Sequence, residues 1–179
     1  MLRTDCHERT RSQTVWPLRV VMLSRQPTIR LGQDADLTAV LALLQAAGLP
    51  TADLTSVSCL HLWVLEAEDS LIGVVGMERF GARALLRSLA VAPSYQQRGM
   101  GHQLVDRLER EAQADDVEQL VLLTETAEKF FRAVGYEVID RRHVPEEIKQ
   151  SAEFRSLCPA SAVCMSKLLT SSPARVSHG

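Results

Sequence analysis

Aromatic side chains are scarce in this chain of 179 residues, since only 4% of its residues are Phe, Trp or Tyr. A platform on which nucleic-acid bases stack is therefore not indicated. Basic charge is also not in excess, because the formal net charge is −2, whereas proteins that bind the phosphate backbone carry a basic surplus. No apolar run approaches the roughly 18 residues that a membrane span requires. We therefore expect neither nucleic acid nor a membrane as a partner.

Cysteine is also sparse and unpatterned. The four cysteines, Cys6, Cys59, Cys158 and Cys164, form no CxxC pair and have no metal-ligand spacing relative to the 5 histidines. This pattern predicts no disulfide framework and no metal site. Thiols without a disulfide pattern are typical of a reducing compartment, so we expect a cytoplasmic location.

The composition that is present is that of a globular domain, with 46% hydrophobic and 23% charged residues. The segment 1–27 differs from the rest, because it has five arginines against two acidic residues and no steady apolar period. We interpret it as a loose or disordered extension, and we expect the part before Met22 to be dispensable for folding. One domain is predicted over 28–169, and the Ser- and Pro-containing tail 170–179 is predicted to be disordered.

Strand and helix patterns alternate within this domain. Strands are predicted at 28–31, 61–66, 71–77, 84–91, 119–123, 136–140 and 162–168. Helices are predicted from an N-cap at Asp34 to a stop at Gly48, and over 99–114, 127–134 and 145–154, whereas 51–58 is a loop or a short helix. The short joins between the strands from 61 to 91 predict an antiparallel meander. The fold class is therefore a mixed α/β (α+β) domain.

The segment from Arg87 to Gly101 indicates a ligand-binding site, and its sequence is RSLAVAPSYQQRGMG. A strand ends at Val91, a short loop follows, and Gly99 and Gly101 open a long amphipathic helix. Glycines let the backbone approach a ligand closely, and the first N–H groups of a helix have no partners within it, so this arrangement favours a phosphate or pyrophosphate. The spacing matches neither GxxxxGK[ST] nor GxGxxG, which excludes the P-loop and the dinucleotide fingerprint.

The chain resembles the GNAT superfamily of N-acetyltransferases over roughly 28–168. The matching residues are Gln96-x-x-Gly99-x-Gly101, the preceding Leu89-Ala-Val-x-Pro93 and the following Leu123-Thr-x-x-Ala-x-x-Phe-Phe-x-x-x-Gly-Tyr136. Within this superfamily the chain is similar to the small acetyltransferases associated with bacterial arsenic-resistance gene clusters, through the segments 84–91 and 153–162.

The resemblance implies a central mixed sheet with an antiparallel meander, splayed parallel fourth and fifth strands, and helices on both faces. It implies acetyl-CoA as the co-substrate, with the pantetheine arm pairing along the fourth strand and the pyrophosphate held by backbone N–H groups at the start of the helix. The positions that it assigns to the coenzyme are Leu89, Ala90, Val91, Gln96, Gln97, Arg98, Gly99, Met100, Gly101, His102, Thr124, Ala127, Phe130 and Phe131.

The implied reaction is direct attack of an amine on the thioester carbonyl. The backbone N–H of Leu89 is the candidate oxyanion donor, and Glu78 is the candidate general base, unless it is a solvated turn residue. Phe131 stands where many members of the superfamily have a tyrosine acid. Arg87 is a candidate for binding a carboxylate or arsonate of the acceptor, with a surface arginine as the alternative.

The segment 153–162 is a candidate wall of the acceptor pocket. Arg155 and Ser156, together with Cys158, are the candidate acceptor contacts, with a purely structural loop as the alternative. The predicted partner is a small-molecule amine, and the predicted state is a monomer or a homodimer. A second function stays open, namely a non-catalytic module that binds acyl-CoA or senses arsenicals. We expect Cys158 and Cys164 to be separate, reduced thiols.

Overall fold

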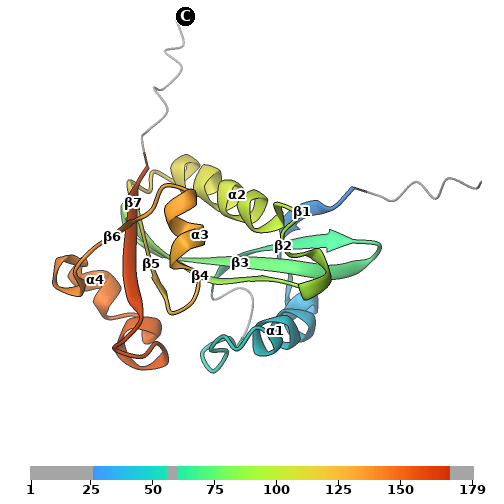
Figure 1. The fold of residues 1–179 in the computed structure, drawn as a ribbon, viewed down its shortest axis with the longest axis horizontal. Coiled ribbons are helices and arrows are strands. Elements are labelled where there is room, and N and C mark those ends of the chain that lie inside the picture. The colour runs from blue at the N-terminus through green and yellow to red at the C-terminus, as the bar shows by residue number, and fades with distance from the viewer. Residues whose placement is uncertain (1–25, 56–59, 170–179) are drawn as a thin grey trace, which may run out of the picture.

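A single mixed sheet of seven strands organises the computed structural model, which describes residues 26–55 and 60–169. The strand order is β1-β2-β3-β4-β5-β7-β6 (Figure 1). The strands are β1 (Thr28–Leu31), β2 (His61–Ala67), β3 (Ser70–Phe80), β4 (Arg83–Val91), β5 (Gln119–Thr124), β6 (Glu137–Val138) and β7 (Val163–Leu168). The expectations for the segment before Met22 and for 170–179 concern residues outside the described ranges.

Strands β2 to β4 form the predicted antiparallel meander, and β1 pairs with β2 in the same antiparallel sense. The turn between β2 and β3 consists of Glu68 and Asp69, both of which have positive φ values, 50° and 59°. Positive φ at both central residues of a two-residue turn matches the twist of the flanking strands. At the next turn Gly81 has a φ of 64°, which glycine adopts without a steric penalty.

Strands β4 and β5 are parallel and pair only over a short stretch. Arg83 to Leu85 pair with Gln119 to Val121, and the two strands diverge beyond this point. The predicted splay is therefore confirmed. β7 then runs antiparallel to β5 along its whole length and separates it from β6.

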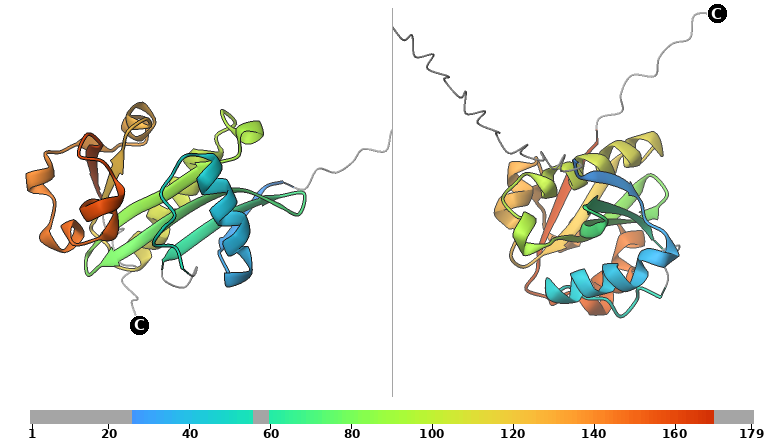
Figure 2. Two further views of the ribbon diagram at one scale, coloured as in Figure 1. Left: turned by 90° about the horizontal axis from the view of Figure 1, so that it is seen from below. Right: turned by 90° about the vertical axis from the view of Figure 1, so that its right-hand side faces the viewer.

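Helices cover both faces of the sheet (Figures 1 and 2). They are α1 (Leu37–Ala46), α2 (Met100–Ala114), α3 (Glu128–Ala133) and α4 (Glu146–Lys149). The largest core lies under α2 and α3, where Leu104, Leu108 and Phe131 pack against β2, β3 and β4. On the opposite face α1 buries Val40 and Leu44, and α4 buries Ile148.

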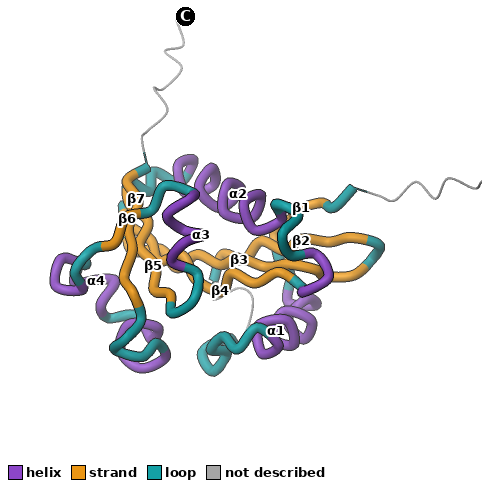
Figure 3. The backbone as a smooth tube through the Cα atoms, in the orientation of Figure 1, coloured by secondary structure: helices purple, strands orange, loops and turns teal. Residues whose placement is uncertain are grey.

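Two predicted elements are wrong in extent. The predicted helix 145–154 is interrupted, because α4 ends at Lys149 and a separate π-helical turn follows at Glu153–Leu157 (Figure 3). Buried Ser151 accounts for the interruption, since its hydroxyl accepts a hydrogen bond from the N–H of Phe154. The predicted strand 136–140 is reduced to β6, because the Asp140 carboxylate accepts from the N–H of Arg142 and starts a 3₁₀ turn.

Replacing Leu108 by alanine should lower the free energy of unfolding by about 2–5 kcal/mol, because the side chain is fully buried between α2 and the sheet. Leu168→Ala is the matched control, since Leu168 is 74% exposed, and it should change that free energy by less than about 0.5 kcal/mol. Urea unfolding followed by circular dichroism measures both. Equal effects of the two substitutions would contradict the placement of α2 on the sheet.

Candidate active site

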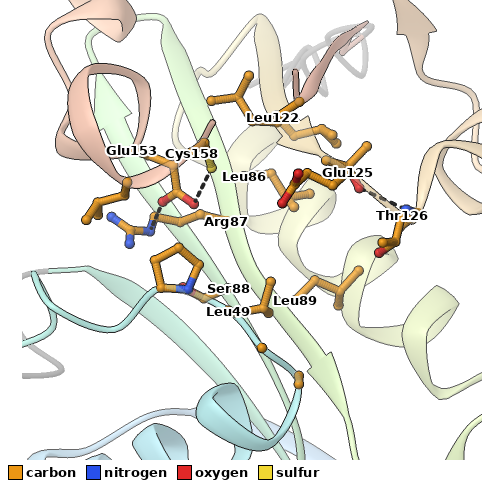
Figure 4. Close-up of a pocket in the computed structure, with 18 of the residues that line it drawn as sticks. Leu49, Leu86, Arg87, Ser88, Leu89, Leu122, Glu125, Thr126, Glu153 and Cys158 are labelled. Carbon is orange, nitrogen blue, oxygen red and sulfur yellow. Dashed lines mark hydrogen bonds and ion pairs between the residues drawn. The ribbon is translucent and has the colours of Figure 1, made fainter. Parts of the chain in front are cut away.

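A cavity of about 370 Å³ opens where β4 and β5 diverge (Figure 4). Five segments form its walls: the end of α1 with the loop behind it, β4, the end of β5, α3, and the segment that contains the π-helical turn. The lining residues are Ala47–Pro50, Leu86–Leu89, Leu122–Ala127, Phe131, Glu153, Leu157–Pro159 and Ala162. The separation of two parallel strands thus creates the space, and chain segments from both faces close it.

The β4 wall of the cavity contains an irregularity in the sheet. Val74 pairs with Ala90 and Gly76 pairs with Arg87, so Ser88 and Leu89 together face a single residue of β3. Ser88 has a φ of 57°, a left-handed conformation that a serine adopts only where the surroundings require it. A bulge of this kind leaves the extra residue unpaired and redirects the backbone. No described strand pairs with β4 beyond Leu85 on the β5 side.

The start of α2 lies directly after this strand. The first hydrogen bond within the helix runs from the N–H of Gln103 to the carbonyl of Gly99, so the N–H groups of Met100, Gly101 and His102 precede it. Such N–H groups, together with the positive end of the helix dipole, attract anions. The side-chain amide of Gln96 donates to the carbonyl of Val91 at 2.9 Å and ties the loop to the end of β4.

The two glycines serve different purposes there. Gly99 has a φ of 78°, and a Cβ placed on it would meet no atom within 4 Å, so its requirement is conformational. A Cβ on Gly101 would lie 3.3 Å from the Phe130 ring, so this glycine allows α3 to approach α2. The sequence predicts glycines here because they let the backbone approach a phosphate. The structure adds a requirement for positive φ at Gly99 and a requirement for close helix packing at Gly101.

Arg87 is the centre of a charged cluster beside the cavity. Its guanidinium is almost completely buried, with 1% of the side chain exposed, and forms two hydrogen bonds with the Asp53 carboxylate. Glu153 Oε2 lies 2.7 Å from Arg87 Nε, and Glu78 Oε2 lies 3.7 Å from Arg87 Nη1. Carboxylates from three distant segments therefore converge on one arginine.

Burial shifts the pKa values in this cluster. Desolvation raises the pKa of the Glu78 carboxyl above its usual value, although the charge of Arg87 opposes the shift. The same two effects act on Glu153, whose pKa is also raised. Desolvation and the neighbouring Glu153 raise the pKa of the Cys158 thiol to about 12, and the thiol lies 3.6 Å from Glu153 Oε1. Desolvation raises the pKa of the Cys164 thiol to about 11.

Residues 58–138 match the family model described as the acetyltransferase (GNAT) domain. Among solved structures, the chain is similar to N-acetylglutamate synthase from Neisseria gonorrhoeae complexed with coenzyme A and N-acetyl-glutamate, with a TM-score of 0.70 and 19% identity over 81% of this chain and 35% of that chain. It is also similar to a Mycobacterium tuberculosis protein solved in complex with CoA, with a TM-score of 0.68 and 23% identity over 80% of this chain and 99% of that one. The chain has the GNAT fold.

A curated relative is named as an N-acetyltransferase. The chain is 26% identical over 103 residues to an uncharacterized N-acetyltransferase of Chlorobaculum tepidum. The match covers 57% of this chain and 64% of the relative, which is less than two thirds of its length. The resemblance to the GNAT superfamily, inferred above from the motifs, is thus supported, whereas no comparison addresses arsenic resistance.

The GNAT fold brings most of the predicted coenzyme positions together at this cavity and at the adjoining start of α2. Leu89, Thr124, Ala127 and Phe131 line the cavity, and the Thr124 hydroxyl accepts from the N–H of Ala127 at 2.9 Å. Phe130 packs edge-on against His102 and so connects α3 to the helix start. The guanidinium of Arg98 lies 5.5 Å from the centre of the Tyr95 ring. The full set of predicted coenzyme positions is Leu89–Val91, Gln96–His102, Thr124, Ala127, Phe130 and Phe131.

Not all of the residues predicted to contact the acceptor lie at the cavity. Arg155 and Ser156 are exposed and do not line the cavity, although their neighbours Glu153 and Leu157 do. Glu78 lies within β3 and does not line the cavity, and it contacts the site through Arg87. The structure adds Asp53 and Glu153, which meet Arg87 from distant segments, and Glu125, which follows Thr124 and lines the cavity.

Within residues 26–55 and 60–169, no group of three or more His, Cys, Asp or Glu side chains is arranged to hold a metal ion. Among the same residues, no helix combines the length and the apolar character needed to cross a bilayer.

The Cys158 thiol should react slowly with iodoacetamide. With a pKa of about 12 it is far less ionised at neutral pH than a free cysteine, so alkylation of the folded protein should be at least about 30-fold slower than that of free cysteine. Peptide mass spectrometry follows this cysteine separately from the others. In urea the same thiol should react at the rate of an ordinary cysteine, and an equally fast reaction in the folded protein would contradict its contact with Glu153.

Proposed function

We propose that this protein is an acetyl-CoA-dependent N-acetyltransferase that transfers the acetyl group to the amine of a small molecule. The observation that carries the proposal is the position of the cavity, which lies between the splayed strands and is connected through α3 to the anion-attracting start of α2: Phe131 lines the cavity, and Phe130 faces Gly101. A coenzyme with a pyrophosphate in one part and a reactive thioester at one end fits such an arrangement. The structures of the Neisseria gonorrhoeae synthase and of the Mycobacterium tuberculosis protein named above both contain CoA.

The coenzyme would extend from α2 into the cavity. Its pyrophosphate would accept hydrogen bonds from the N–H groups between Gln97 and His102, and its pantetheine arm would pair with β4 at Leu89 to Val91. That edge of β4 lacks a described strand partner beyond Leu85, so its backbone groups are available for a ligand. Thr124, Ala127 and Phe131 would form the opposite wall.

The reaction would need three functions at the thioester. A neutral amine attacks the carbonyl carbon, the new C–N bond forms as the C–S bond breaks, and the amine proton passes to a base. Glu78 is the proposed base, because desolvation brings its pKa closer to neutral pH. The N–H of Leu89 at the bulge is the proposed donor to the oxyanion. Phe131 has no acidic proton, so water would protonate the leaving thiolate.

A coupled assay for thiol release tests the proposal directly. The protein is incubated with acetyl-CoA and a panel of amino acids, polyamines, aminoglycosides and amino-group-containing arsenicals, and free CoA is measured. Release with at least one amine supports the proposal. A role in arsenic resistance in the cytoplasm is the more specific part of the proposal, and it rests on the sequence resemblance alone, so the arsenicals in the panel test it.

A non-catalytic acyl-CoA-binding module is the second candidate, because Phe131 stands where many relatives have a tyrosine acid. Tight binding of acetyl-CoA without CoA release from any amine would favour it. Arsenite binding at micromolar affinity that is lost in Cys158→Ser would favour an arsenical sensor. We expect no such binding, because Cys158 lies after the π-helical turn with its thiol near Glu153, whereas Cys164 is buried in β7.

Gly101→Asp should weaken acetyl-CoA binding by at least about 2 kcal/mol. The new side chain carries a negative charge beside the pyrophosphate and its Cβ meets the Phe130 ring. Gly101→Ala is the matched control, because it adds the Cβ without the charge, and it should have a much smaller effect. Isothermal titration calorimetry measures both, with circular dichroism as the check on folding. Unchanged affinity in a folded Gly101→Asp protein would remove the main support for the coenzyme site.

Glu78→Gln should lower kcat by roughly 100-fold or more and remove the acidic limb of the pH–rate profile.

The raised pKa of Glu78 also has a consequence for the stability of the protein. A carboxyl whose pKa is higher in the folded state than in the unfolded state lowers stability as the pH rises through the folded value. The Gln variant should therefore melt no lower than the wild type above neutral pH.

Glu137→Gln serves as the control, because Glu137 is an exposed carboxylate on β6, away from the cavity. It should leave kcat and the pH profile unchanged. If Glu78→Gln raises only KM, Glu78 attracts a cationic substrate rather than accepting its proton. If neither constant changes, Glu78 has no role in the reaction.

A further inference from the structure

We propose that the acceptor end of the cavity takes an amine that carries a second cationic group and no carboxylate. This inference rests on the proposed acetyltransferase function and names the substrate class of the same site. It departs from the expectation that Arg87 binds an anionic group of the acceptor. The charges that face the cavity carry the inference.

Among the described residues that line the cavity, Arg87 is the only lysine or arginine. Its guanidinium is buried and is paired with Asp53, Glu153 and Glu78. Arginine recognises carboxylates by presenting two parallel N–H groups, and here Asp53 already takes that position. A substrate carboxylate could bind to Arg87 only by displacing one of these partners from a buried ion pair.

The carboxylates outnumber this single cation. Glu153 and Glu125 both line the cavity, and Glu125 projects from the end of β5 toward the β4 side (Figure 4). Asp53 and Glu78 add their charges through the contact with Arg87. Even with burial favouring the protonated form of Glu78 and Glu153, the site retains no cation that is free to meet an anion.

Two other guanidiniums lie near the segment that closes the cavity, and neither lines it. Arg155 is exposed, whereas Arg141 stacks over the Phe154 ring at 5.1 Å and donates to the carbonyl of Pro159. No lysine is found among the described residues that line the cavity. The field at the acceptor end is therefore negative, and a cation desolvated there is stabilised by carboxylates, whereas a carboxylate is repelled.

Apolar side chains form much of the rest of the cavity wall, beside the hydroxyls of Ser88, Thr124 and Thr126. They include Leu49, Leu86, Leu122 and Leu157, whose side chains suit a chain of methylene groups. An acceptor with an amine at one end, a methylene chain and a second cation at the other end therefore matches both features of the lining. The reacting amine loses its proton for attack, while the second cation keeps its charge beside Glu125.

The test uses pairs of amines that differ only in a carboxylate. Cadaverine is lysine without its carboxylate, and agmatine is arginine without its carboxylate. We expect kcat/KM for the decarboxylated member of each pair to exceed that of the amino acid by at least about tenfold. Equal values, or a preference for lysine and arginine, would overturn the inference while leaving the acetyltransferase function intact.

A variant of the cavity wall identifies the group that holds the second cation. Glu125→Gln should raise KM for cadaverine by at least about tenfold with kcat changed by less than about twofold. Glu128→Gln is the matched control, because Glu128 pairs with Arg132 on α3 and does not line the cavity. Glu125 forms no part of the Arg87 cluster, so its replacement leaves that buried ion pair in place.

The two proposals fail in different ways. If no amine releases CoA although calorimetry shows acetyl-CoA binding, both the acceptor class and catalysis are refuted, and the binding module remains. If CoA release occurs with amino acids and not with diamines, only the acceptor class is refuted. A KM for cadaverine that is the same in Glu125→Gln and in the wild type would refute the role of Glu125.

Discussion

The buried guanidinium of Arg87 is the interaction on which the architecture of the site depends. It joins the loop after α1 through Asp53, the neighbouring strand β3 through Glu78, and the segment after α4 through Glu153. None of these segments is close to another in sequence, and each contributes one carboxylate. Removal of the Arg87 guanidinium would leave these carboxylates without a counter-charge, and breaking a buried ion pair in this way typically costs about 3–5 kcal/mol. The cluster therefore holds the walls of the cavity in register as well as setting its charge.

The cavity itself results from a competition between strand pairing and side-chain packing. β4 and β5 pair only from Arg83 to Leu85, and beyond that point the bulge at Ser88 turns the β4 backbone away from a regular ladder. The backbone groups released in this way remain polar and need partners. A ligand that supplies a peptide-like edge satisfies them, so the defect in the sheet and the proposed coenzyme site have one physical origin.

Short-range sequence patterns predicted those features of the fold that depend on interactions between residues close in sequence. The strands, the meander, the start of α2 and its two glycines follow from alternation, short turns and backbone freedom, and the motif from Gln96 to Gly101 predicts a site for an anion at that helix start. The carboxylates around Arg87 could not be predicted, because Asp53 and Glu153 lie 34 and 66 residues from it and no spacing rule connects them. The interruption of the helix predicted at 145–154 was missed because it depends on the burial of the Ser151 hydroxyl, which is a property of tertiary packing.

The insertion of β7 between β5 and β6 has a consequence for how the molecule is made. Strands β1 to β4 follow one another closely and can assemble as they leave the ribosome, but β5 obtains its antiparallel neighbour only after residues up to Leu168 have been synthesised. The segment that carries Glu153 and Cys158 closes the cavity at the same late stage. A nascent chain that extends only through β4 would therefore have a meander with an open sheet edge at β4, and it would lack the complete site until the segment through β7 had been synthesised.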